Sequence, residues 1–244
     1  MCYTEHTAGE EAKPLRTERI VGDRMCYFYG DGRASDLLIQ PVDDHDLEAL
    51  DQEVERIGEL ASDSSFLLVA LKISDWNREL SPWEAPAVFG KAGFGAGAQD
   101  TLAYIAGTLL PEIGRCCPSP EERRCYLGGY SLAGLFALWA AYQTDLFQGV
   151  AAVSPSVWFP QWIRYAQEHE MRAAHVYLSL GDREEKTKNR VMAEVGNCIR
   201  RQHALLREAK TVRACALEWN PGNHFVDSGG RTAKGFAWLL QQTR

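Results

Sequence analysis

"YLGGYSLAGLFALWAAY", residues 126–142, places a single serine, Ser131, between an apolar run that ends in glycines and a stretch that is apolar nearly all round. The first part predicts a buried strand, and the second predicts a helix that is buried on every side. A sharp turn from strand to helix needs very small residues around its central position, and Gly129 and Ala133 meet that need. Such a turn is typical of a serine nucleophile, although serine is also a common helix cap.

Outward from this turn, strand-like and helix-like segments alternate along the chain. Strands are predicted over residues 36–40, 65–73, 123–130, 149–154, 174–181 and 212–219, with one or two more over 18–30. Helices are predicted over 46–61, from near 98 to beyond 113, and over 131–143, 161–168, about 186–207 and about 232–242. A long loop spans 74–97. This alternation predicts an α/β fold with a mostly parallel central sheet and helices on both faces.

We expect the whole chain, residues 1–244, to form one such domain, with residues 1–17 as a poorly ordered or extended lead-in. The net charge of −7 and the lack of a basic block disfavour nucleic acid and acidic membranes as partners. The first 14 residues carry acids where a secretory signal carries lysine or arginine, and no apolar run approaches membrane-spanning length. Seven cysteines without a CxxC pair disfavour a disulfide framework and a zinc site. We therefore expect a cytoplasmic protein, and its oligomeric state stays open.

Two other patterns are better explained without a ligand. "GKAGFGAG", residues 90–97, lacks the spacing and the Ser/Thr of a phosphate-binding loop, so we expect a flexible loop that enters a helix. "DDHD", residues 43–46, places acids at a helix start, where capping and the helix dipole account for them. No cofactor and no metal are expected.

A serine nucleophile needs a base, and the base needs an orienting acid. Among six histidines, only His224 lies in a Pro/Gly-rich loop that follows a predicted strand and precedes the last helix. The acid should leave a strand end between Ser131 and His224. The segment "LSLGDREEK", residues 178–186, offers three acids there; we favour Glu184, with Asp182 as the alternative.

With these residues in place, the chain resembles the α/β-hydrolase fold, and within it the putative-esterase family that includes the enterochelin esterases and esterase D-like enzymes. The resemblance rests on "GGYSLAGL", "DWNRELSPW", "VSPSVWF", "LSLGDREEK" and "GNHF", which extend from about residue 37 to the carboxyl terminus. It implies Ser131 as nucleophile, His224 as general base and Glu184 at the acid position.

The resemblance also implies two backbone N–H donors that stabilise the oxyanion, those of Leu132 and, after the strand "LLVALKI", of Ile73. The loop "DWNRELSPWEAP" is expected to border the substrate pocket through Arg78 and Trp83, and Trp158 is expected to enter it from the loop after "AAVS".

The sequence thus predicts a serine hydrolase that cleaves a small-molecule ester through an acyl-enzyme intermediate. Two alternatives remain open at this point. One is an acyltransferase or thioesterase that uses the same three residues, and the other is a non-catalytic binding protein that has kept the fold.

Overall fold

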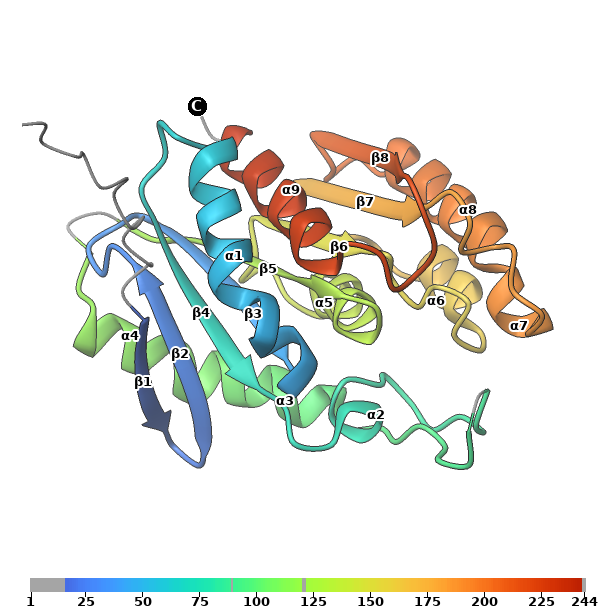
Figure 1. Ribbon diagram of the computed structural model, residues 1–244, viewed down its shortest axis with the longest axis horizontal. Helices are drawn as coiled ribbons and strands as arrows, with labels where there is room; N and C mark the ends of the chain where they lie inside the picture. The colour runs from blue at the N-terminus through green and yellow to red at the C-terminus, as the bar shows by residue number, and fades with distance from the viewer. Residues whose placement is uncertain (1–15, 89, 120–121, 243–244) are drawn as a thin grey trace, which may run out of the picture.

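The structure, a computed structural model, describes residues 16–88, 90–119 and 122–242. Within them one sheet of eight strands runs through the centre, in the order β1-β2-β4-β3-β5-β6-β7-β8 (Figure 1). All neighbouring strands from β4 to β8 in that order are parallel, whereas β1 and β2 run antiparallel to their neighbours. The strands are β1 (Arg16–Val21), β2 (Arg24–Gly30), β3 (Asp36–Val42), β4 (Phe66–Lys72), β5 (Arg124–Tyr130), β6 (Gly149–Val153), β7 (His175–Gly181) and β8 (Ala214–Asn220).

Helices cover both faces of this sheet. Figure 1 shows α1 and α9 side by side on the near face, and their apolar sides pack there on residues of β3 to β7. Helices α3 to α6, with η1, and helix α8 supply the core on the opposite face. The helices are α1 (Asp44–Leu60), α2 (Trp76–Glu79), α3 (Ala98–Tyr104), the π-helical turn η1 (Ile105–Leu109), α4 (Leu110–Cys116), α5 (Leu132–Gln143), α6 (Trp162–Glu168), α7 (Arg190–Ala193), α8 (Val195–Glu208) and α9 (Ser228–Gln241). The prediction of an α/β fold with a mostly parallel sheet covered on both faces is confirmed.

The apolar pattern of the sequence explains most of these elements. Strands β3 and β4 are buried along nearly their whole length, because the runs "DLLIQPV" and "FLLVALK" are covered on both sides. Helix α5 is buried at every residue except its last, Gln143, which agrees with its lack of a polar face. It anchors the turn that precedes it in the core.

Several element boundaries differ from the sequence-based expectation. Residues 16 and 17, expected in the lead-in, belong to β1, and the rest of that lead-in lies outside the described residues. The helix expected over 186–207 does not begin until α7, where the Asn189 side chain accepts hydrogen bonds from Val191 N–H and Met192 N–H, and α8 follows as a separate helix. The loop over 74–97 contains the short helix α2.

The last helix begins four residues before its expected start. The Asp227 side chain caps it by accepting a hydrogen bond from Gly230 N–H. Its second residue, Gly229, faces α1: a Cβ there would lie 3.5 Å from Ala49 and 3.6 Å from Glu53. A Cβ on Gly230 would instead lie 2.4 Å from Oδ1 of Asp227. Gly229 therefore lies at the contact between two helices, and Gly230 leaves room for the capping carboxylate, where the sequence indicated a loop.

In the described part of the chain, no helix has both the length and the apolar composition needed to cross a membrane.

Candidate active site

Ser131 lies in a tight turn between β5 and α5, in a backbone conformation that few residues other than glycine adopt (φ 57°, ψ −118°). The neighbouring small residues permit this turn. A Cβ on Gly129 would lie 2.6 Å from the Cβ of Ala133, and a Cβ on Gly134 would lie 2.9 Å from the Gly129 carbonyl oxygen. Larger side chains at these positions would therefore force the turn open.

The Ser131 hydroxyl does not cap α5, although Ser131 occupies the capping position. Its Oγ instead lies 3.1 Å from Nε2 of His224. The backbone of Ser131 is fixed on both sides, because its N–H donates to the Val153 carbonyl and its C=O accepts from Ser156 N–H, each over 3.0 Å. The turn thus presents the hydroxyl toward the imidazole.

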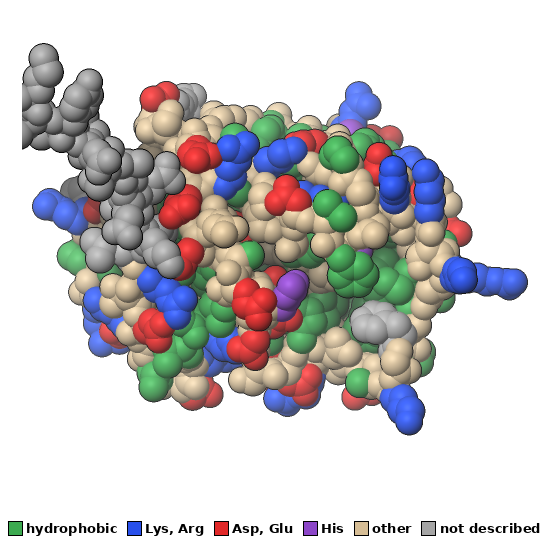
Figure 2. Space-filling view, in the orientation of Figure 1, with side chains coloured by type: hydrophobic (Ala, Val, Ile, Leu, Met, Phe, Trp, Pro, Cys, Tyr) green, Lys and Arg blue, Asp and Glu red, His purple; other side chains and the backbone are tan. Residues whose placement is uncertain are grey.

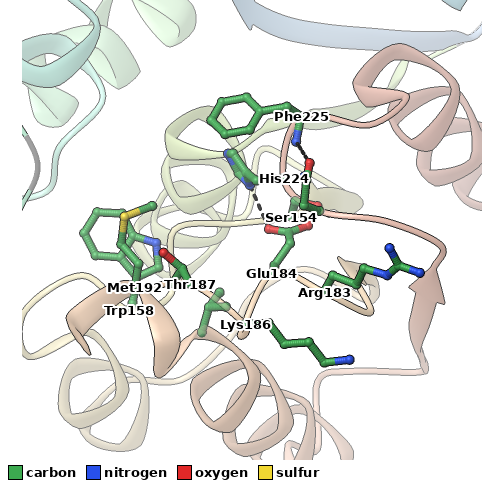
Figure 3. Close-up of a pocket in the computed structure, with 11 residues that line it drawn as sticks. Ser154, Trp158, Arg183, Glu184, Lys186, Thr187, Met192, His224 and Phe225 are labelled. Carbon is green, nitrogen blue, oxygen red and sulfur yellow. Dashed lines mark hydrogen bonds and ion pairs between the residues drawn. The ribbon is translucent and has the colours of Figure 1, made fainter. Parts of the chain in front are cut away.

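His224 lies in the loop between β8 and α9, at the carboxyl end of the sheet. Its Nδ1 lies 2.7 Å from Oε2 of Glu184, which follows β7 in the chain, and Figure 3 shows this contact as a dashed line. A carboxylate is a hydrogen-bond acceptor, so the Nδ1–H donates to it and Nε2 is left as an acceptor toward Ser131. The structure therefore brings Ser131, His224 and Glu184 into one hydrogen-bonded line.

The other carboxylate oxygen of Glu184 is also fully used. It accepts hydrogen bonds from Gly181 N–H and from the Ser154 hydroxyl, each over 2.7 Å, and from the Arg231 guanidinium over 3.2 Å. Burial acts to raise the pKa of Glu184, but the hydrogen bond and charge of His224 and the bonds from Ser154 and Gly181 N–H outweigh it and lower that pKa. Glu184 is thus held as a carboxylate.

Asp182, the alternative acid, has a different partner. One of its carboxylate oxygens accepts a hydrogen bond from Gly222 N–H over 2.8 Å. It therefore supports the loop that carries His224 without contacting the imidazole, whereas Glu184 contacts the ring directly.

Three further residues belong to this site, and the sequence predicted no role for them. The Tyr130 hydroxyl donates to the His224 carbonyl over 2.7 Å. Ser154, which binds Glu184, has a positive φ of 42° and is buried just after β6. Arg231, in the first turn of α9, is buried beside both, although an arginine in a helix is usually a solvent-facing residue. Only the packing of distant strand ends could have identified these three.

The two expected oxyanion donors have different environments. Leu132 is the first residue of α5, so its N–H has no carbonyl partner within the helix. The prediction for Ile73 is wrong, because the Ile73 N–H donates to the Val42 carbonyl over 2.9 Å and so extends the pairing of β4 with β3. Within the described residues, the Trp76 N–H, the first of α2, donates to no protein acceptor.

Two cavities meet at His224 and Phe225. The serine-side cavity, of about 150 Å³, lies over the Ser131 hydroxyl, and the acid-side cavity, of about 260 Å³, lies over Glu184. The Phe225 ring between them is 88% exposed, which is unusual for so large an apolar group. Besides these shared residues, the serine-side cavity is lined by Asp43, His45, Asp46, Trp76, Tyr130, Ser131 and Ser228, and the acid-side cavity by Ser154, Trp158, Arg183, Glu184, Lys186, Thr187, Met192, Val195 and Asn223.

The walls of the acid-side cavity have two chemical characters. Figure 3 shows Trp158 and Met192 on one side of Glu184, with Arg183 and Lys186 toward the other. Figure 2 shows hydrophobic side chains around a hollow in this face of the molecule, with acidic side chains and a histidine beside it. The cavity can therefore hold a ligand that is partly aromatic and partly anionic.

Of the three expected pocket residues, the structure places only Trp158 in one of these two cavities. The expectation for Trp83 is wrong, because its indole N–H donates to the Pro160 carbonyl over 3.0 Å and its ring packs on Phe159. Arg78 is also outside both cavities: its exposed side chain pairs with Asp75 over 3.5 Å.

The two segments that the sequence explained without a ligand, residues 90–97 and residues 43–46, form hydrogen bonds within the protein. In the loop over 90–97, the N–H groups of Phe94, Gly95 and Gly97 donate to carbonyls of residues 77–85. Asp43 and Asp46 form a reciprocal capping box at the start of α1.

Comparisons with known proteins agree with this fold. A family model described as "Putative esterase" matches residues 44–228, which is more than half of the chain. Among curated proteins, none matches.

Several solved structures are similar to the chain over almost its full length. Siderophore hydrolase EstA from Aspergillus nidulans is 17% identical with a TM-score of 0.74, and the match covers 98% of this chain and 100% of that one. An IroE-like serine hydrolase from Shewanella oneidensis is 14% identical with a TM-score of 0.74, and the match covers 93% of this chain and 80% of that one. Enterochelin esterase from Shigella flexneri is 17% identical with a TM-score of 0.68, and the match covers 96% of this chain and 60% of that one. At these identities the likeness shows a shared fold.

Proposed function

Because the chain belongs to the putative-esterase family and is an ester-hydrolysing enzyme, we propose that it is a serine hydrolase in which Ser131 is the nucleophile, His224 the general base and Glu184 the orienting acid. The observation that carries this proposal is the line from Glu184 through His224 to Ser131, with distances of 2.7 and 3.1 Å. These distances lie within the hydrogen-bond reach that proton transfer requires.

The reaction proceeds in two halves. Ser131 Oγ attacks the ester carbonyl carbon while its proton passes to His224 Nε2, and the resulting imidazolium is stabilised by the Glu184 carboxylate. The tetrahedral intermediate then expels the alcohol, which takes the proton from Nε2, and an acyl group remains on Ser131. Water attacks this acyl-enzyme with His224 again as base, so that the acid is released and the serine is restored.

The negative charge on the carbonyl oxygen needs two N–H donors, and we assign them to Leu132 and Trp76. Both are first residues of helices, where the backbone N–H has no partner within the helix, and at α5 the helix dipole also favours an anion. Trp76 also lines the serine-side cavity. A crystal structure of the Ser131 phosphonate adduct tests this assignment: a phosphoryl oxygen beyond about 3.5 Å from either nitrogen would contradict it.

A siderophore ester is the substrate class that we favour. Two observations support it. Structural neighbours are named siderophore hydrolases and an enterochelin esterase, and the acid-side cavity offers Trp158 and Phe225 with Arg183 and Lys186 to a ligand that is both aromatic and anionic. Mass spectrometry of the products from catecholate and hydroxamate ester siderophores distinguishes between these two types, and cleavage of neither would overturn the substrate class while leaving the esterase proposal intact.

The nucleophile is tested with short-chain aryl esters. Replacing Ser131→Ala is expected to lower kcat by at least about 10⁴-fold without changing the melting temperature greatly, because the hydroxyl is lost and the fold is kept. Ser65→Ala is the matched control, since its hydroxyl binds Asp31 just before β4, at the other end of the strands. A fluorophosphonate probe should label the unmodified protein and not Ser131→Ala. Activity that survives in Ser131→Ala would refute the assignment.

The same three residues could pass the acyl group to another acceptor. Measuring the products with and without an added alcohol or thiol decides between hydrolysis and acyl transfer. We expect the free acid to dominate; a product that is mainly the new ester or thioester would identify an acyltransferase.

A further inference from the structure

The guanidinium of Arg231 lies where the carboxyl ends of four strands meet. Its side chain is 1% exposed. One terminal nitrogen lies 3.1 Å from the Tyr130 hydroxyl and 3.2 Å from Oε1 of Glu184, and the other donates to the carbonyls of Pro221 and Asn223 over 2.8 and 3.2 Å. Tyr130 is the last residue of β5, Glu184 follows β7, and Pro221 and Asn223 follow β8. The hydroxyl of Ser154, which follows β6, lies 3.5 Å from the first of these two nitrogens. One side chain of α9 thus joins the elements that hold the three active-site residues.

The loop that carries His224 is fixed largely through these contacts. Pro221 and Asn223 flank Gly222, whose φ of 103° is open to glycine and disfavoured for other residues. Tyr130, itself bound to Arg231, donates to the carbonyl of His224. Burial, with the charge of Glu184, raises the pKa of Tyr130 to about 12, so this hydroxyl stays a donor. Arg231 therefore holds the loop at Pro221 and Asn223 directly and at His224 through Tyr130.

The charge of Arg231 has a second effect. Among the described residues, Glu184 is the carboxylate that it contacts, and both side chains are almost fully buried. The same carboxylate faces His224 through its other oxygen. A buried cation beside one oxygen reduces the negative potential that the imidazole experiences from the carboxylate.

We propose that Arg231 is a positioning residue for the esterase reaction: it fixes the loop of His224 and, by partly neutralising Glu184, sets the pH range in which His224 can accept the Ser131 proton. This inference rests on the proposed function of those three residues. Arg231 touches no reacting atom and acts entirely through its neighbours.

Other charged groups face His224 and must stay constant in any comparison of variants. They come from α1 and its cap, from β5, from the loop after β7 and from the cap of α9, and among them Tyr130 is titratable but neutral at neutral pH. They are Asp43, His45, Asp46, Tyr130, Arg183 and Lys186 around the two cavities, and Asp227 next to the loop.

Two variants separate the geometric role from the electrostatic one. Arg231→Lys keeps the cation but has one nitrogen where arginine has two, so it cannot bind both the Glu184 side and the two loop carbonyls. We expect kcat to fall about 10- to 100-fold while the acidic limb of the pH profile of kcat/KM stays in place. Arg231→Gln also removes the charge, so Glu184 stabilises the imidazolium more strongly. In that variant we expect the acidic limb to move upward by about one pH unit in addition to the fall in kcat.

Arg124→Met is the matched control. Arg124 pairs with the buried Asp36 through two hydrogen bonds at the opposite ends of β5 and β3, so this variant loses a comparable ion pair away from His224. It should lose stability with no movement of the acidic limb. A limb that stays fixed in Arg231→Gln, or that moves equally in Arg124→Met, would overturn the electrostatic role.

A direct readout keeps this test separate from the esterase proposal. The imidazole resonances of His224, assigned in NMR spectra with a His224→Gln variant, report its protonation whether or not an ester is cleaved, and Arg231→Gln should move this titration upward by about one pH unit. If Arg231→Gln does not fold, Arg231→Lys still decides the geometric role, because unchanged activity in it would overturn that role. Failure of the esterase proposal would appear in Ser131→Ala, independently of these results.

Discussion

Glu184 and Glu53 are both almost fully buried, at 8% and 5% exposure, yet the structure affects their carboxyl groups in opposite directions. Glu184 receives hydrogen bonds from His224, Ser154 and a backbone N–H, and these overcome burial and lower its pKa. Burial and the nearby charge of Asp46 disfavour the ionised form of Glu53, so its pKa lies well above the ordinary value. At neutral pH a buried glutamate is therefore ionic only where donors have been placed around it.

The choice between the two candidate acids is directly testable. Glu184→Gln should lower kcat by about 10²- to 10⁴-fold, because a neutral amide cannot stabilise the imidazolium of His224. Asp182→Asn removes a charge only two residues away but keeps an oxygen that can accept from Gly222 N–H, so we expect activity within a few-fold of the unmodified enzyme. Steady-state kinetics with an aryl ester compares the two, and the opposite ranking would assign the acid to Asp182.

Among the elements, α9 departs most informatively from what the sequence predicts. Its first turn contains Gly229 and Gly230, which normally indicate a loop, and Asp227 before them has a φ of 54°. The Asp227 side chain nevertheless caps the helix, and the first turn carries Arg231 into the centre of the site. A boundary error of four residues was thus enough to hide this side chain from a sequence-based assignment.

The cap of α9 should contribute measurably to stability. Asp227→Ala loses the bond from Gly230 N–H and places alanine in a left-handed conformation, so the free energy of unfolding should fall by about 1–2 kcal/mol. Asp227→Asn is the control, because asparagine tolerates this conformation and keeps a capping oxygen. Urea unfolding measures both; equal stability of Asp227→Ala and the unmodified protein would show that the cap is dispensable.

The elements that the sequence predicted well are those whose signal is local. The apolar runs of β3 to β7 and the all-apolar α5 depend on burial alone, and the turn at Ser131 depends on its small neighbours. His224 was recognisable because a Pro/Gly-rich loop between a strand and a helix has few other reasons to carry a histidine. The predictions for Ile73 and Trp83 were wrong for a different reason. The Ile73 N–H donates to the Val42 carbonyl and the Trp83 indole N–H donates to the Pro160 carbonyl, and no residue near either one in the sequence reveals those partners.

At the scale of the whole molecule, Glu53 lies in the layer that joins α1 and α9 to the sheet. Its folded-state pKa is raised above the ordinary value of 4.5, so the folded protein keeps a proton that the unfolded chain releases. The contribution of Glu53 to stability is therefore fully present below about pH 4.5 and is lost as the pH rises toward the folded-state pKa. This side chain makes the enzyme less stable at neutral pH than at mildly acidic pH, apart from other groups.

Glu53→Gln should remove this dependence, because glutamine has the shape of the protonated acid and no proton to release. The free energy of unfolding should rise by at least about 1 kcal/mol at pH 7 and stay unchanged near pH 4. Urea unfolding at both pH values measures the difference. Glu48→Gln, on the exposed face of α1, controls for the change in net charge. A loss of stability at pH 7 would mean that Glu53 is ionised and stabilising.

The position of Arg231 near the carboxyl terminus also determines when the site becomes complete during synthesis. A ribosome produces Ser131 and Glu184 well before it reaches His224 and Arg231, and domains fold largely as units once their chain is available. A nascent chain, or one shortened by proteolysis before β8 ends, therefore carries the serine without its base or the arginine that holds the base in place. On the proposed mechanism, such a chain should not hydrolyse an ester, and we expect activity only once His224 has been synthesised and α9 has packed on the sheet.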